Sequence, residues 1–128
     1  MINDTRRQET IDAARAVREH AYAPYSEYTV GAAILTRSGE IFGGVNVENA
    51  SYGVTICAER SALASAVSSG AREFVGIALA TKNGAPPCGV CRQALAEFAP
   101  ALVVWLVDEA GQVRETTLGA LFPDGFGL

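Results

Sequence analysis

The sequence contains a single lysine, Lys82, and its arginines are dispersed along the chain. Proteins that bind nucleic acids neutralise phosphates with clustered Lys and Arg side chains, whereas the formal net charge here is −4. The composition therefore argues against a polynucleotide partner. It favours a ligand that carries no phosphate, because such a ligand needs no basic patch.

Long apolar runs are also missing. The longest, residues 101–107, is far too short to span a bilayer. Residues 1–7 are polar and do not resemble a secretory leader. We therefore expect a soluble, cytoplasmic protein that does not contact membranes. With 128 residues, of which 49% are hydrophobic, the chain is expected to form one domain, residues 1–128, around its own core.

Cysteine is scarce too, and its odd count argues against a framework of disulfides. Cys57 is followed at a distance by Cys88 and Cys91, which form a Cys-x-x-Cys pair. On spacing alone, these residues could bind zinc, form a redox-active pair or be inert buried thiols. Pro87 before the pair and Glu59 close to Cys57 favour zinc. Three protein ligands leave the fourth position of a tetrahedral zinc open, as in catalytic sites.

Hydrophobic spacing and turn residues predict the secondary structure. Alanine-rich and apolar-periodic segments indicate helices, and short apolar runs indicate strands. Because strands alternate with helices, we expect an α/β sandwich built on a mixed sheet. The expected helices span residues 5–20, 57–69 and 88–98, and the expected strands span 28–36, 41–47, 74–80, 101–107 and 112–116.

The connection between the last two predicted strands is informative because it is short. Only residues 108–111 separate them. A parallel crossover requires about a dozen residues or more, so these two strands should be antiparallel.

Several motifs occur in an order that resembles the short, homotetrameric class of cytidine deaminases. A ligand-x-Glu motif followed by Pro-Cys-x-x-Cys is typical of zinc-dependent deaminases. The likeness extends from about Tyr22 to about Phe126, through residues 22–33, 46–52, 57–60 and 87–93. The resemblance implies a three-layer α/β/α sandwich with a mixed five-stranded sheet. It also implies hydrolysis of cytidine and 2′-deoxycytidine to the uridines and ammonia in pyrimidine salvage, by a homotetramer with shared active sites.

The same resemblance assigns the chemistry to the motif residues. Cys57, Cys88 and Cys91 would hold one zinc ion per chain. Glu59 would carry a proton from water to N3 of the pyrimidine and then to the departing amine. A glutamate that merely complements the helix dipole is the simpler alternative. Arg60 and Gln93 would offset the charge of three thiolates, although either could instead be a solvated helix residue.

Six further residues match substrate-binding positions of the family. Asn46 and Glu48 would bind the ribose 3′-hydroxyl, and the backbone N–H of Ala58 would bind the pyrimidine O2. Tyr28 and Phe126 would flank the base, and Tyr52 would complete the pocket of a neighbouring subunit. Polar strand ends and ordinary core packing are the alternatives. Position 28 is more often Phe in this family, so Tyr28 could add a hydrogen bond.

Other functions remain open from the sequence. One is a related deaminase for a modified nucleoside such as blasticidin S, and residues 46–48 favour the ordinary nucleoside over it. Another is a non-catalytic zinc-binding module, which needs a fourth ligand. His20 is a poor candidate, because it ends the first predicted helix, where a histidine can interact with terminal carbonyls. A redox-active protein would have a Cys88–Cys91 disulfide and no metal.

Overall fold

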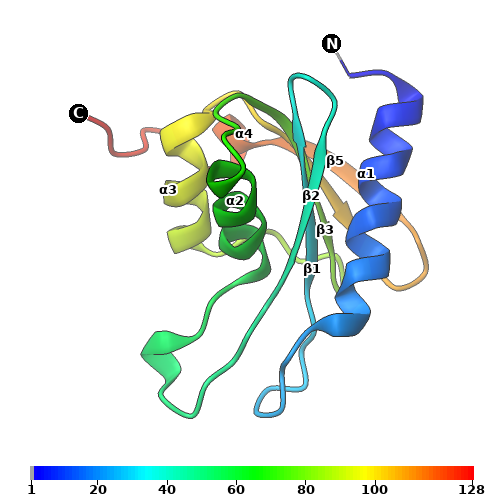
Figure 1. Ribbon diagram of the computed structural model, residues 1–128, viewed down its shortest axis with the longest axis vertical. Coiled ribbons are helices and arrows are strands. Elements are labelled where there is room, and N and C mark those ends of the chain that lie inside the picture. Colours follow the sequence, from blue (N-terminus) through cyan, green and yellow to red (C-terminus); the bar gives the residue numbers. More distant parts are fainter. Residues whose placement is uncertain (1) are drawn as a thin grey trace.

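The computed structural model describes residues 2–128, which form a five-stranded sheet flanked by helices (Figure 1). The strand order is β2-β1-β3-β4-β5. β3 and β4 are parallel, and all other neighbouring strands are antiparallel. The predicted mixed sheet is therefore confirmed, including the antiparallel final pair. The strands are β1 (Gly31–Thr36), β2 (Ile41–Val45), β3 (Phe74–Ala80), β4 (Val103–Val107) and β5 (Val113–Thr117).

Helices cover both faces of the sheet, which gives the expected three layers. α1 lies on one face, and α2 and α3 lie on the other (Figure 1). Within residues 2–128, no helix combines the length and the apolar character needed to cross a lipid bilayer. The helices are α1 (Asp4–Val17), α2 (Ala58–Ser68), α3 (Gly89–Phe98) and α4 (Leu118–Leu121), with short 3₁₀ turns η1 (Arg18–His20) and η2 (Tyr52–Val54).

Some boundaries differ from the sequence predictions for identifiable reasons. The first strand was predicted to start at residue 28 but begins at Gly31, because the backbone of residues 28–30 bonds to the Asn46 side chain. The predicted first helix of residues 5–20 changes to the tighter η1 turn after Val17. η2 and α4 were not predicted. Each is far shorter than the window of about 11–18 residues in which a helical hydrophobic pattern can be recognised.

The alternation of side chains along β1 divides the core into two layers. Ala32 and Ile34 pack toward α2 and α3, whereas Ala33 and Leu35 pack toward α1. All four side chains are buried. β1 is thus an interior strand with apolar residues on both faces, as expected for a sheet covered on both sides.

α2 lies unusually close to the backbone of β2 at Gly44. A Cβ atom at this position would stand 2.3 Å from the backbone nitrogen of Ala62 and 2.8 Å from the carbonyl oxygen of Ala58. Only glycine permits this approach. The sheet therefore fixes the position of the first turn of α2.

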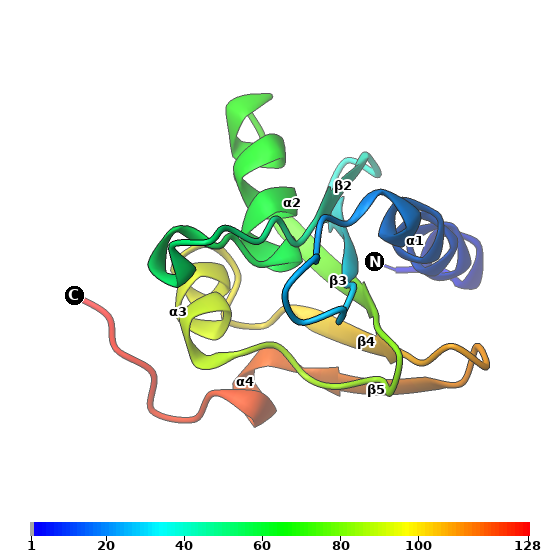
Figure 2. The same ribbon diagram turned by 90° about the horizontal axis from the view of Figure 1, so that it is seen from below.

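α2 and α3 begin at the same end of the sheet, the lower end in Figure 1. β2 leads through residues 46–57 into α2, and β3 leads through residues 81–88 into α3. Figure 2 views the molecule from this end and shows both connections passing over it. The predicted metal ligands lie where these two connections enter their helices.

Candidate metal and active site

Two of the three cysteines occupy N-cap positions. Cys57 precedes α2 and Cys88 precedes α3, both with extended backbone, and neither side chain caps its helix. Cys91 lies in the first turn of α3 and is buried. The Sγ–Sγ distances are 3.8 Å for Cys57–Cys88 and 3.4 Å for Cys88–Cys91, and all three sulfurs lie within 4.8 Å of one another.

This spacing fits a single zinc ion. Sulfurs bound at about 2.3 Å to a tetrahedral zinc are separated by roughly 3.8 Å. Among residues 2–128, the group of side chains that could hold a metal consists of these cysteines alone, and His20 lies outside it in η1. The donor set is therefore three soft sulfurs, which favours zinc over magnesium or calcium.

The thiols are also prepared electrostatically for a metal. A hydrogen bond from Cys91 lowers the pKa of Cys57 to about 5, and Arg60 contributes to the same shift. The same hydrogen bond and burial raise the pKa of Cys91. Without metal, the thiol of Cys57 therefore loses its proton more readily than that of Cys91. Zinc binding has to displace the thiol protons that remain, because zinc binds thiolates.

Arg60 lies beside the sulfurs with part of its hydrogen-bonding capacity unused. Cys57, followed by Cys91, raises the pKa of its guanidinium group. Nη2 donates to the backbone carbonyl of Thr55 at 3.4 Å, while the buried Nε has no hydrogen-bond partner in the part of the chain described. A buried donor without a partner is costly. Negative charge on neighbouring thiolates would offset this cost.

Glu59 is a buried carboxyl group in the first turn of α2, with a relative exposure of 5%. Burial raises its pKa, and the charge of Cys57 acts in the same direction. Its carboxylate is not part of the sulfur cluster. It therefore stands close to the candidate metal site as a group that can hold a proton at higher pH than an exposed glutamate.

Cys57, Cys88 and Glu59 line a cavity of about 310 Å³. The cavity is formed by the segment before β1, the segment between β2 and α2, the start of α2, the end of β3 and the segment between β3 and α3. Of the residues predicted to contact substrate or metal, those in its wall are Tyr28, Asn46, Glu48, Cys57, Ala58, Glu59 and Cys88.

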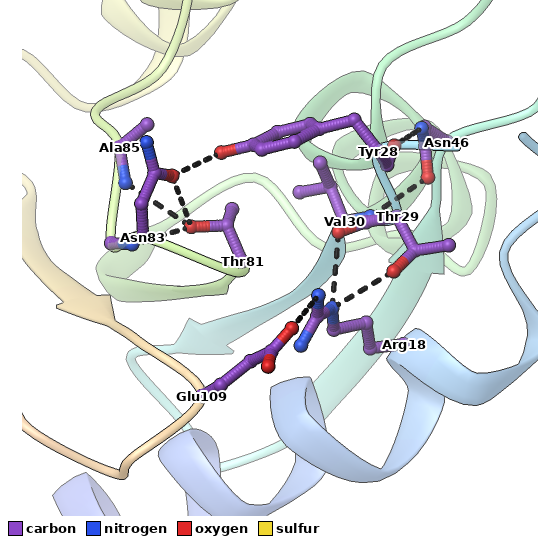
Figure 3. Close-up of polar contacts among 10 residues, drawn as sticks. Arg18, Tyr28, Thr29, Val30, Asn46, Thr81, Asn83, Ala85 and Glu109 are labelled. Atoms are coloured by element: carbon purple, nitrogen blue, oxygen red, sulfur yellow. Dashed lines mark hydrogen bonds and ion pairs between the residues drawn. The ribbon is translucent and has the colours of Figure 1, made fainter. Parts of the chain in front are cut away.

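Asn46 and Glu48 have structural partners that the sequence did not reveal. Asn46 Oδ1 accepts from the N–H of Val30 at 2.9 Å, and its Nδ2 donates to the carbonyl of Tyr28 at 2.8 Å (Figure 3). Glu48 accepts from the N–H groups of Tyr25 and Ser26 and from the Ser26 hydroxyl, and the last of these bonds lowers its pKa most. Both side chains thus shape the segment before β1.

Gln93, Tyr52 and Phe126 are among the predicted residues that lie outside the cavity wall. Gln93 Nε2 donates to the backbone carbonyl of Phe126 at 3.1 Å rather than to a sulfur. The Phe126 side chain is 72% exposed, in the C-terminal segment after α4. Tyr52 is 77% exposed and its ring contacts Tyr25 edge-on, with centroids 6.3 Å apart. Within one chain, neither aromatic ring reaches the cavity that contains Glu59.

The structure adds residues that the sequence analysis missed. Thr81 is buried in the cavity wall, and its hydroxyl accepts from the N–H groups of Gly84 and Ala85 (Figure 3). Arg92 Nε donates to the carbonyl of Pro87. A polar residue directly after an apolar strand is a signal that could have identified Thr81. No local pattern marks Arg92, because its contacts depend on the folded backbone.

Known proteins resemble this chain in sequence and in structure. Residues 4–107 match the family described as the cytidine and deoxycytidylate deaminase zinc-binding region. The chain is 49% identical over 123 residues to a cytidine deaminase of Halalkalibacterium halodurans, covering 94% of this chain and 93% of that protein.

Two solved structures are similar over nearly the whole chain. A cytidine deaminase from Burkholderia pseudomallei is 50% identical, with a TM-score of 0.90 over 93% of this chain and 98% of that one. A cytidine deaminase from Mycobacterium tuberculosis is 36% identical, with a TM-score of 0.85 over 99% of this chain and 100% of that one. With this sheet, this cysteine cluster and these relatives, the chain belongs to the cytidine and deoxycytidylate deaminase family.

Proposed function

We propose that this protein hydrolyses cytidine and 2′-deoxycytidine to uridine and 2′-deoxyuridine with release of ammonia. The observation that carries the proposal is the cavity lined by Cys57, Cys88 and Glu59. It joins two members of the three-sulfur cluster to a buried glutamate whose pKa is raised. Cys57, Cys88 and Cys91 would hold one zinc ion per chain. When bound, zinc supplies a Lewis acid that activates water for attack.

Glu59 carries the protons in this proposal. It accepts a proton from the attacking water and donates it to N3 of the pyrimidine ring. The water oxygen adds to C4 as a hydroxyl group. Glu59 then accepts the proton of this hydroxyl and passes it to the amine, so that the C4–N4 bond breaks, C4 becomes a carbonyl and ammonia leaves. A carboxyl group with a raised pKa suits both directions of transfer, because it gains and loses a proton closer to neutral pH.

The residues of the cavity wall have unused hydrogen-bond donors and acceptors that support a nucleoside ligand. Asn46 uses one of its two amide hydrogens on Tyr28, so a second stays available for a ribose hydroxyl. A carboxylate has about four acceptor sites, of which Glu48 uses three. Ala58 is the first residue of α2, where a backbone N–H has no acceptor within the helix and can donate to the pyrimidine O2. Tyr28 would lie against the base.

An assembly of four chains with shared sites belongs to the same proposal. Large apolar side chains are exposed on the segments that flank Tyr52. Such a surface is unusual for a monomer and is typical of a protein interface. It would let Tyr52 and Phe126 complete the pockets of neighbouring subunits. We expect the assembly to act in pyrimidine salvage in the cytoplasm. The exposed residues are Tyr22, Tyr25, Val47, Tyr52, Val54 and Ile56.

The test follows the ultraviolet absorbance of cytidine with the wild-type protein and with Glu59→Gln, with zinc per chain measured in both. We expect deamination by the wild type and a loss of about 10²–10⁴-fold in the variant, at about one zinc per chain in each. Sedimentation of the same samples reports the oligomeric state, and a monomeric mass would exclude shared sites.

Other outcomes would point to other functions. Bound zinc without cytidine turnover, but with turnover of blasticidin S, would assign the site to the modified nucleoside. A Cys88–Cys91 disulfide without zinc would indicate a redox protein instead. Wild-type activity in Glu59→Gln would exclude the proton transfer described above.

A further inference from the structure

Tyr28 and Asn83 join two walls of the nucleoside cavity. The Tyr28 hydroxyl donates to Asn83 Oδ1 at an O–O distance of 2.6 Å. Tyr28 belongs to the segment before β1, and Asn83 belongs to the segment between β3 and α3. Both segments contribute to the cavity wall, through Tyr28 on one side and through Thr81 and Ala85 on the other. Figure 3 shows the ring of Tyr28 extending from one segment to the other.

The segment that carries Asn83 is braced internally. The Thr81 hydroxyl accepts from the N–H of Gly84 at 2.8 Å and of Ala85 at 3.1 Å, and it lies 3.5 Å from Asn83 Oδ1. Gly84 has a φ of +71°, which favours glycine. Asn83 also forms an isolated β-bridge with Asp108, after the end of β4. The acceptor for the tyrosine hydroxyl therefore stands on a fixed turn.

The backbone of Tyr28 is held as well. Its carbonyl accepts from Asn46, and its N–H donates to the Ser26 hydroxyl at 3.0 Å. A tyrosine has only two side-chain torsions, so fixing the backbone and the hydroxyl fixes the ring. A ring held in its binding orientation before the ligand arrives loses less entropy on binding.

We propose that Asn83 is a positioning residue for the nucleoside, which acts by holding the ring of Tyr28 against the base. The inference rests on the proposed function and adds to it a determinant of substrate affinity. We expect the contact between Tyr28 and Asn83 to affect substrate binding more than the chemical step. The other end of the segment, next to the metal-ligand candidate Cys88, is held by a different contact. Arg92 Nε donates to the carbonyl of Pro87, the residue before Cys88, at 2.7 Å.

The kinetic test compares Tyr28→Phe, Asn83→Ala and the double variant with cytidine as substrate. Both single changes remove the Tyr28–Asn83 hydrogen bond, so we expect KM to rise about two- to tenfold while kcat and zinc content stay near wild type. The double variant should resemble the single ones, because both remove the same contact. Asn83→Asp keeps an acceptor and should retain a KM near wild type.

Lys82→Ala provides the matched control in the same segment. Its side chain is exposed and makes no ion pair or hydrogen bond within residues 2–128, so its KM should equal that of the wild type. An unchanged KM in Asn83→Ala would overturn the proposal. The proposal would also be overturned if Asn83→Ala raised KM by the same factor in the Tyr28→Phe background as in the wild type, because Asn83 would then act without the tyrosine hydroxyl.

Hydrogen exchange of residues 81–88 tests the contact without using activity. In the zinc-loaded protein, we expect faster exchange in Tyr28→Phe and Asn83→Ala than in the wild type or Lys82→Ala. Equal exchange in all four would overturn the proposal. If the wild type fails to deaminate cytidine while the exchange rates differ as expected, the proposed substrate is wrong, but the contact between the two walls stands.

Discussion

Arg92 holds the backbone of Pro87, the residue that immediately precedes the metal-ligand candidate Cys88. The Nε–O distance is 2.7 Å, and Nη1 of the same guanidinium donates to the carbonyl of Leu121 in α4. One side chain thus connects the entry to α3 with the helix that follows the last strand. We expect these two hydrogen bonds to help fix the position of the Cys88 sulfur, although the hydrogen bonds of Arg92 go to backbone carbonyls and not to a sulfur.

Replacing Arg92 with alanine should weaken zinc binding. The carbonyl of Pro87 loses its donor, and the Cys88 sulfur is held less firmly. Changes in outer-shell partners typically cost about 10–100-fold in metal affinity. Zinc retained against increasing chelator measures the effect. Arg72→Ala is the matched control, because Arg72 also binds backbone carbonyls, those of Val67 and Ala71, but at the far end of α2. Equal retention in the two variants would contradict the prediction.

Gly44→Ala should destabilise the protein and disturb the metal site together. The added Cβ would stand 2.3 Å from the backbone nitrogen of Ala62, so α2 has to move away from β2. Overpacking of this kind costs about 1–3 kcal/mol or more. Chemical unfolding and zinc content report the two effects. Gly53→Ala, where a Cβ would meet nothing within 4 Å, should change neither.

Arg60→Gln should raise the pKa of Cys57 in the metal-free protein. Arg60 is one cause of the lowered value of about 5, while the hydrogen bond from Cys91 is the larger one. The pKa should therefore rise but stay below the ordinary thiol value of 9.0. The rate of alkylation of Cys57 as a function of pH, followed by mass spectrometry, measures the shift. An unchanged profile would show that the guanidinium does not stabilise this thiolate.

Glu59→Gln should alter how the stability of the metal-free protein depends on pH. Burial raises the pKa of Glu59 in the folded state above its ordinary value of 4.5. As the pH rises past 4.5, the unfolded chain releases this proton before the folded chain does, so the wild type loses stability. The glutamine has no such proton to lose.

Thermal unfolding at a series of pH values measures this difference. The gain in melting temperature of Glu59→Gln over the wild type should be small below pH 4.5 and larger at neutral pH. The exposed Glu97→Gln is the matched control. A gain that does not change with pH would mean that burial does not perturb Glu59.

The sequence was most informative where structure is determined locally or by simple geometry. Hydrophobic spacing and turn residues predicted all five strands, and the short link after Val107 predicted the antiparallel final pair. The cysteine and glutamate motifs predicted two helix starts, and these starts bring the three sulfurs together. Such features depend on neighbours in the chain or on the lengths of connections.

Contacts between distant segments could not be predicted in this way. Asn46 was expected to face a ribose, and its bonds to Tyr28 and Val30 depend on how a strand end meets a separate loop. Gln93 was expected to offset the charge of the sulfurs or to be solvated, and its bond to the backbone carbonyl of Phe126 was not foreseen. A polar side chain has several possible partners, and the folded backbone decides which of them comes within reach. The assignments of Tyr52 and Phe126 stay predictions that require neighbouring subunits.

The common starting end of α2 and α3 has a consequence for how the chain can vary. The segments that shape the cavity, residues 22–30, 46–57 and 81–88, all lie at that end of the sheet. The turns at the opposite end, residues 37–40 and 69–73, border a separate hollow with no cysteine in its wall. Insertions or fused peptides at these distant turns should therefore leave deamination intact. One end of the sheet carries the residues of the active site, and the turns at the other end can change in length.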